Sequence, residues 1–183
     1  LPLRTGIGQK HSLSFEMGTK ELNTQFNVSY NNVEGVMKDS WRRNFAGSAQ
    51  ITYRVKNLMF RDIARITSNS TQDSPYGTFN QYAVMNPYTP AYDENGKPTK
   101  QDSSLGSNYS PLYNATTGTK DKTSYLDFSN NFYIEYKPIE TEKDILKLTA
   151  RLGISAKRSD ADEFYSYKHT KFANTPSTEQ NLM

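Results

Sequence analysis

Aromatic side chains gather between residues 71 and 126, where asparagine and aspartate flank them. Aromatic ring faces stack on the C–H surfaces of sugars, and side-chain amides bond hydroxyl groups. The candidates for contact with a substrate or a partner protein are Tyr76, Phe79, Tyr82, Tyr88, Tyr92, Tyr109 and Tyr113. Long ordered loops also need internal cores. We therefore expect packing of these rings within the segment first, and binding as the alternative.

A second group of candidates is polar and charged and lies on one parity of three alternating segments. Its members are Gln50, Arg54, Glu135, Lys147 and Arg151. A row of cations with a carboxylate across from it can steer a charged substrate. We expect the plainer role, in which these side chains line a wet surface and pair with nearby carboxylates.

No spacing of residues predicts a catalytic or metal centre. His11 and His169 lie far apart, cysteine is absent, and no metalloprotease, nucleophile-elbow or phosphate-loop motif occurs. The stretch from Asp93 to Gly96 lacks the ligand spacing of a calcium loop, whereas Asn-Gly is a strong turn signal. We expect no enzyme activity, no cofactor and no metal. A net charge of +3 without a recognisable binding motif also predicts no nucleic-acid partner.

These candidates depend on the elements that position them, and period-two alternation indicates long strands. In the run FAGSAQITYRV, Phe45, Ile51 and Tyr53 share one parity, and Gln50 and Arg54 share the other. The same pattern predicts strands at about 11–18, 22–33, 45–55, 58–69, 127–139 and 144–158. Ordinary strands have about five or six residues, whereas membrane-spanning strands need about nine to eleven. The lengths favour strands that span a membrane.

One predicted strand is less regular than the others. In the segment 58–69, Asp62 falls on the apolar parity and Ile63 on the polar parity. Its remaining apolar residues agree with one another.

The connections between the predicted strands alternate in length. Residues 18–21, 56–57 and 140–143 form short turns, whereas 34–44 is longer and about 71–126 is a very long loop. Short periplasmic turns and long extracellular loops are typical of outer-membrane barrels. The predicted fold class is therefore all-β, an antiparallel transmembrane β-barrel with long extracellular loops.

The composition agrees with one apolar belt and a wet interior. Only 34% of residues are hydrophobic, although the chain has 13 tyrosines and nine phenylalanines. Tyr30, Tyr53 and Tyr136 lie near strand ends on the apolar parity, as expected of an aromatic girdle. Six strands cannot close a barrel whose smallest examples have about eight, and the sequence begins at Leu1 without a signal peptide. We expect residues 1–183 to be part of one incomplete barrel domain.

A family resemblance runs from about Leu1 to Gly153, and it is clearest in two stretches. Residues 11–70 begin HSLSFEMGTKELNTQFNVSYNN and continue through VMKDS at 36–40, and MNPYTPAYDENGKP follows at 85–98. This combination resembles the early barrel of SusC/RagA-type TonB-dependent outer-membrane transporters of the Bacteroidetes. The family often has a second glycine where this chain has Gly18-Thr19.

The resemblance implies a fragment of a barrel of about 22 strands, in the cell outer membrane of a Gram-negative bacterium of the Bacteroidetes type, with lipid on its outer face. It implies import of oligosaccharides or peptides, energised by the TonB complex, with a SusD-like surface lipoprotein as a lid. The sequence contains neither the family's plug domain nor its TonB box. Contact with TonB would therefore run through a region outside it.

Two alternatives stay open. A soluble β-sandwich that binds carbohydrate would also show alternation and surface aromatics, but turns would interrupt its strands about every eight to twelve residues. An outer-membrane enzyme barrel would need an inward Ser–His pair near its rim. The hypotheses differ in what covers the apolar side of the strands and in where His11 and His169 lie.

Overall fold

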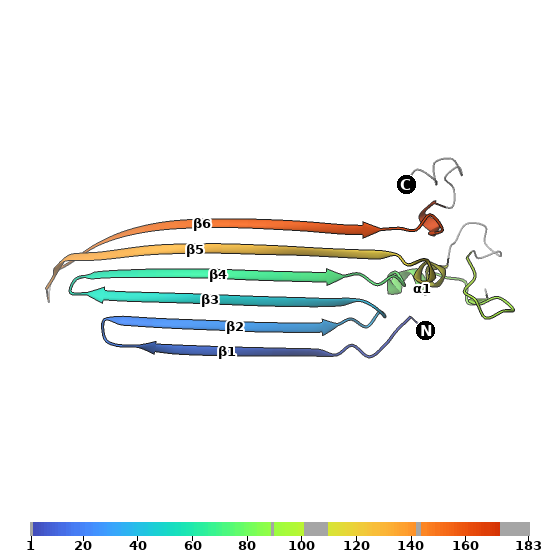
Figure 1. Cartoon of the computed structure of the whole chain (residues 1–183), viewed down its shortest axis with the longest axis horizontal. Helices are drawn as coiled ribbons and strands as arrows, with labels where there is room; N and C mark the ends of the chain where they lie inside the picture. Colours follow the sequence, from blue (N-terminus) through green and yellow to red (C-terminus); the bar gives the residue numbers. More distant parts are fainter. Residues whose placement is uncertain (1, 89, 101–109, 142–143, 173–183) are drawn as a thin grey trace.

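One antiparallel sheet dominates the structure, which is a computed structural model that describes residues 2–88, 90–100, 110–141 and 144–172. Its strand order is β1-β2-β3-β4-β5-β6, so sequence neighbours pair throughout (Figure 1). The strands are β1 (Gly8–Gly18), β2 (Leu22–Glu34), β3 (Trp41–Val55), β4 (Leu58–Gln72), β5 (Lys120–Glu140) and β6 (Ile145–Phe164). The helices are α1 (Phe79–Ala83), α2 (Pro111–Asn114), η1 (Ala115–Thr117) and η2 (Thr170–Phe172). The prediction of an all-β, antiparallel fold is confirmed.

The strands extend further than the alternation indicated, and the long loop is shorter than predicted. β5 begins at Lys120 rather than 127, and β6 ends at Phe164 rather than 158. The loop therefore runs over about 73–119 rather than 71–126. The ladder continues through polar pairs such as Lys122 and Asp162. Backbone hydrogen bonds do not require apolar side chains, so the hydropathy pattern ends before the strand does.

The cross-strand register gives the sheet two unlike faces. Directly paired residues lie on the same face. The apolar face carries Leu13, Phe15, Met17, Phe26, Val28, Tyr30, Phe45, Ile51, Tyr53, Phe60, Ile66, Phe128, Phe132, Ile134, Tyr136, Leu148, Leu152 and Ile154. The polar face carries Asn, Gln, Ser and Thr with most of the charged side chains of the strand centres.

The described residues have no apolar core. Among them, the buried residues are Thr24, Thr52, Ser110 and Pro111. The chain exposes 13183 Å² of surface, whereas a compact monomer of 20.9 kDa exposes roughly 9,000 Å². The apolar face of this single layer therefore lacks a covering layer within the described part of the chain.

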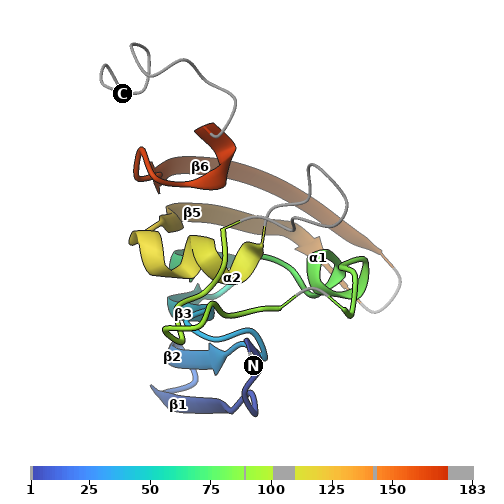
Figure 2. The ribbon, with the colours of Figure 1, turned by 90° about the vertical axis from the view of Figure 1, so that its right-hand side faces the viewer.

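The two ends of the sheet differ. The connections β1–β2, β3–β4 and β5–β6 lie at one end, to the left in Figure 1, and α1, α2 and the long loop lie at the other. We call these the short-turn end and the loop end. Viewed from the loop end, the strands form a curved single layer with α1 and α2 in front of it (Figure 2). Within the described residues, no helix is both long and apolar enough to cross a membrane.

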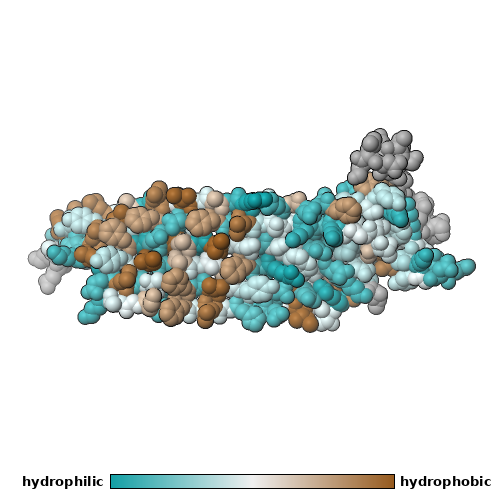
Figure 3. All heavy atoms as spheres, viewed as in Figure 1, coloured by the Kyte–Doolittle hydropathy of each residue, from teal (hydrophilic) through white to brown (hydrophobic). Residues whose placement is uncertain are grey.

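Apolar side chains gather toward the short-turn end. In Figure 3 brown side chains cover that half of the sheet, and teal ones cover the half nearer the loops. We call the apolar part of this face the belt. On β6 it runs from Leu146 to Ala156, where Arg158 and Asp160 follow on the same face.

Candidate functional site

The polar face holds the residues that we predicted from the sequence to line a solvated surface. Gln50 pairs with Gln25 and Ile63, and Arg54 pairs with Met59 on β4. Alternation alone therefore placed the side chains of this group on the correct face. Their role as the lining of a lumen stays a prediction.

Glu135 is the acceptor at the centre of a small polar network. Its Oε2 accepts hydrogen bonds from Lys147 Nζ at 2.7 Å and from the Tyr133 hydroxyl at 2.7 Å. Lys147 lies on β6, so the expected pairing of this cation with a carboxylate across the strand pair is present. The carboxylate is thus engaged by two donors from its own sheet.

Two arginines bracket the ring of Tyr133. Arg61 of β4, Tyr133 of β5 and Arg151 of β6 form one cross-strand row. The Arg61 guanidinium carbon lies 6.0 Å from the ring centroid, and that of Arg151 lies 5.2 Å from it. Arg61 Nε is buried and has no hydrogen-bond partner within the described structure. These guanidiniums are held by a ring rather than by a carboxylate.

A cavity of about 480 Å³ opens at this row, and we call it the polar-face cavity. Its lining includes Met59, Arg61, Tyr133, Glu135, Lys147 and Arg151. Gly153 also lines it, and the Asn131 side chain lies so close that a Cβ at position 153 would be 3.1 Å from Asn131 Oδ1. The sequence analysis missed Arg61 and Tyr133. Their parity would have placed them on the polar face, but only the register shows that they share one row.

The irregular residue of β4 has a partner. Asp62 lies on the apolar face, between Ile51 and Phe132 in the register. Asn130 Nδ2 donates a hydrogen bond of 2.9 Å to Asp62 Oδ1. The alternation of β4 is therefore intact, and the polar residue within the belt is satisfied by an amide on β5.

The loop aromatics do not form one cluster. Tyr76, Tyr82 and Tyr113 are half-buried. In contrast, Phe79 and Tyr92 are exposed, and Tyr88 is 91% exposed. Tyr109 lies outside the described residues. The expected packing of the rings thus holds for only part of the set, and the exposed members keep their predicted role as contacts.

Tyr82 anchors the first turn of the long loop. Its hydroxyl donates a 2.7 Å hydrogen bond to the Tyr76 carbonyl oxygen. Burial, followed by the neighbouring Tyr76 and Tyr92, raises the pKa of Tyr82 to about 12. The phenol is therefore a neutral structural donor at physiological pH.

The predicted turn at Asp93 is present. Asp93 Oδ1 accepts hydrogen bonds from the backbone N–H groups of Asn95 and Lys97, at 2.9 and 2.8 Å. Gly96 has a φ of 73°, which favours glycine. This carboxylate oxygen is occupied by the turn itself.

A second cavity, of about 560 Å³, lies at the loop end, and we call it the loop-end cavity. It brings together Met37, Asp73, Phe79, Pro111, Tyr165 and His169, which come from segments distant in sequence. Asn114 joins two of these segments, because its Nδ2 donates to Thr170 Oγ1 at 2.8 Å and its Oδ1 accepts from Thr170 N–H at 3.1 Å.

His11 and His169 lie at opposite ends of the strand order. His11 is on β1, and its Nε2 lies 3.4 Å from Gln9 Oε1. His169 follows β6, where its Nδ1 accepts the N–H of Lys171 at 3.0 Å. Burial, and then the charge of Lys171, lowers the pKa of His169. In the described structure neither imidazole is hydrogen-bonded to a serine hydroxyl.

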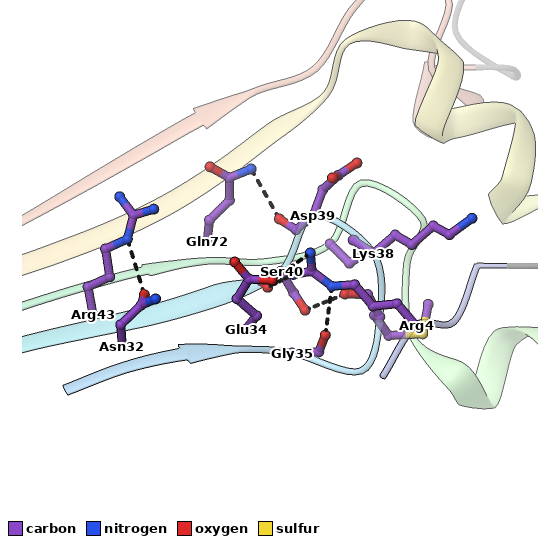
Figure 4. Close-up of polar contacts among 11 residues, drawn as sticks. Arg4, Asn32, Glu34, Gly35, Lys38, Asp39, Ser40, Arg43 and Gln72 are labelled. Carbon is purple, nitrogen blue, oxygen red and sulfur yellow. Dashed lines mark hydrogen bonds and ion pairs between the residues drawn. The ribbon is translucent and has the colours of Figure 1, made fainter. Parts of the chain in front are cut away.

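The β2–β3 loop is fixed by Arg4, as Figure 4 shows. Arg4 Nε donates to the Gly35 carbonyl at 3.0 Å and Nη2 to the Ser40 carbonyl at 2.8 Å. Its Nη1 lies 3.1 Å from Glu34 Oε2. One side chain therefore joins residues 2–7 to both ends of this loop.

The same loop is held from the other side by the last residue of β4 and by a residue just after this strand. Ser74 Oγ donates to the Lys38 carbonyl at 2.6 Å, and Gln72 Nε2 donates to the Asp39 carbonyl at 3.3 Å. Asp39 has a φ of 61°, a left-handed conformation that aspartate tolerates. The loop thus connects the N-terminal segment to the wall of the loop-end cavity.

Comparison with known protein families finds no matching family model, and comparison with curated proteins finds no match. The class that the described residues define is an all-β protein with one meandering antiparallel sheet.

Proposed function

We propose that this chain is part of the wall of an outer-membrane β-barrel. The observation that carries the proposal is the belt: a single layer of long strands has one apolar face that nothing in the described chain covers. Exposed apolar patches of this size are rare on soluble monomers. Lipid hydrocarbon covers such a face without a second protein layer.

The dimensions of the belt support this proposal. Leu146 to Ala156 is eleven residues of β6, and the ten steps between them span about 34 Å at about 3.4 Å per step. With a tilt of about 35–45°, this length corresponds to a height of about 24–28 Å. The apolar band of outer-membrane barrels is about 25 Å tall. The short-turn end would face the periplasm and the loop end the outside.

The soluble β-sandwich is less well supported. A sandwich buries the apolar faces of two sheets against each other. The described residues form one sheet, and its strands have 11 to 21 residues. Both features favour the membrane wall over the carbohydrate-binding module.

For the complete protein we propose TonB-dependent import of oligosaccharides or peptides, with a SusD-like lipoprotein as a lid. The support is the sequence resemblance over residues 11–70 and 85–98. The exposed rings of Phe79, Tyr88 and Tyr92 at the loop end would contact substrate or lid. TonB itself would act through a region outside this sequence.

Membrane extraction tests the proposal. Envelope membranes that contain the native protein are washed with alkaline carbonate and then with detergent. We expect the protein to stay in the pellet after carbonate and to leave only with detergent. Release by carbonate alone would contradict a lipid-covered belt and would favour the soluble module.

A photo-crosslinker tests the lid contact separately. Placed at Tyr88, it should capture a surface lipoprotein in intact cells. Placed at Ser129, which is on the polar face of β5, it should not. Equal labelling from both positions would contradict a lid at the loop end.

A further inference from the structure

The charged residues of the polar face are strongly unbalanced where that face lies behind the belt. On β3 to β6 they are Arg54, Arg61, Arg65, Asp127, Glu135, Lys147, Arg151 and Lys157. Six are cations and two are carboxylates. A concave face with one sign of charge raises the local concentration of ligands of the opposite sign.

Within the polar-face cavity, one carboxylate faces three cations. Glu135 is already engaged by Lys147 and Tyr133. In the described structure neither Arg61 nor Arg151 has a carboxylate partner. Arg61 also leaves its buried Nε without a hydrogen bond, which costs free energy until an acceptor arrives.

The Arg61–Tyr133–Arg151 row holds two guanidinium groups beside the Tyr133 ring. Arg61 and Arg151 approach Tyr133 from the neighbouring strands on either side. Guanidinium groups present fixed pairs of N–H donors that match a carboxylate. The cavity of about 480 Å³ at this row leaves room for a ligand.

We propose that Arg61 and Arg151 form a carboxylate-binding site in the polar-face cavity, which selects acidic oligomers on their passage along this face. The inference rests on the proposed function, because it takes this face as the lining of a transport path. The carboxylate belongs to a uronate-containing oligosaccharide or to an acidic peptide. Both present the same group to the two guanidiniums.

Binding of defined probes to the full-length protein, purified in detergent, tests the site. The probes are a galacturonate trimer, a hexaglutamate peptide and their neutral counterparts, a galactose trimer and a hexaglutamine peptide. We expect at least one acidic probe to bind and its neutral counterpart to bind at least about tenfold more weakly. The acidic probe that binds identifies the source of the carboxylate. The absence of binding by both acidic probes, or equal binding of the matched neutral probe, overturns the proposal.

Matched variants locate the site. Arg61→Gln and Arg151→Gln should each weaken acidic-probe binding about tenfold or more. Arg65→Gln removes the same charge from the same strand and face but lies outside the cavity lining, and it should change binding less than about twofold. An equal loss in all three variants would show a diffuse field rather than a site, and would overturn the proposal.

A variant that is expected to strengthen binding excludes misfolding as the cause of the weaker binding in the arginine variants. Glu135→Gln removes a carboxylate and frees Lys147, so acidic-probe binding should become tighter. Unchanged or weaker binding contradicts the site. Carbonate extraction of the membranes from which the protein is purified reports on the proposed function independently: retention in the pellet together with failure to bind would reject only the carboxylate site.

Discussion

The short-turn half and the loop half of the sheet share the same strands but have different surroundings. In the short-turn half, Ile51, Phe132 and Leu152 lie on one face and uncharged or charged polar groups on the other. In the loop half, the face that carries the belt in the other half carries Ser124 and Asp160. The hydrogen-bonded ladder is continuous across both halves.

The difference shows that strand formation and an apolar face are separate properties of these segments. The backbone ladder specifies where the strand lies, and side-chain hydropathy specifies which part of it would face hydrocarbon in the proposed barrel wall. Beyond Ala156 the β5–β6 ladder continues through pairs such as Ser124 and Asp160. Both faces of this part of the sheet carry polar side chains. The wall would thus rise above the membrane and carry the loop-end cavity there.

A charge within the belt should have the largest effect. Leu152→Arg places a cation near the middle of the belt and should destabilise the folded protein in lipid vesicles by about 2–4 kcal/mol. Ser124→Arg makes a charge of the same sign on the same face in the loop half and should cost at most about 1 kcal/mol. Denaturant unfolding of the vesicle-bound protein measures both values. Equal costs would remove the distinction between the two halves.

The polar pair within the belt gives the next largest effect. Asn130→Leu leaves Asp62 without its amide donor and should cost about 1–3 kcal/mol. The double variant Asp62→Leu/Asn130→Leu removes both groups and should restore most of that stability. Unfolding in the same vesicles measures the cycle. A harmless Asn130→Leu would mean that water, rather than hydrocarbon, reaches this position.

The loop half should respond locally to the loss of Arg4. Arg4→Ala removes two hydrogen bonds to carbonyls and one ion pair, and should lower the local stability of residues 35–40 by about 1 kcal/mol. Hydrogen exchange at the Gly35 and Lys38 amides measures this change. Arg42→Ala is the matched control on β3 and should leave the exchange unchanged. Faster exchange throughout the belt would contradict a local effect.

The smallest effect is a pH dependence at the loop end. The folded structure lowers the pKa of His169 below its ordinary value of 6.5 through burial and then Lys171. As the pH falls, His169 is protonated in the unfolded state before it is protonated in the folded state. The stabilisation is therefore complete above about pH 6.5 and is lost as the pH falls through the folded pKa. Protonated Nδ1 also cannot accept the Lys171 N–H. Protection of that amide, corrected for intrinsic exchange, should fall on acidification in the native protein and not in His169→Gln.

Sequence periodicity was sufficient for the strands and their faces, and insufficient for side-chain partners. Alternation placed Gln50, Lys147 and Arg151 on one face because parity is a local property. It began β5 too late, at 127, and ended β6 too early, at 158, since polar rows carry no hydropathy signal. It also missed the Arg61–Tyr133–Arg151 row, which depends on a register spanning three strands. The loop aromatics were the hardest to predict, because no period constrains where Tyr82 or Tyr88 points.

Spin labels along β6 test the central claim most directly, because the chain has no cysteine to remove. Single cysteines at positions 147 to 163 are labelled in vesicle-bound protein, and accessibility to oxygen and to an aqueous nickel complex is measured. Even positions from 148 to 156 should be open to oxygen and closed to nickel, odd positions the reverse, and both faces beyond Asp160 open to nickel. Nickel access at the even belt positions, or shielding from both reagents there, would contradict a face covered by lipid.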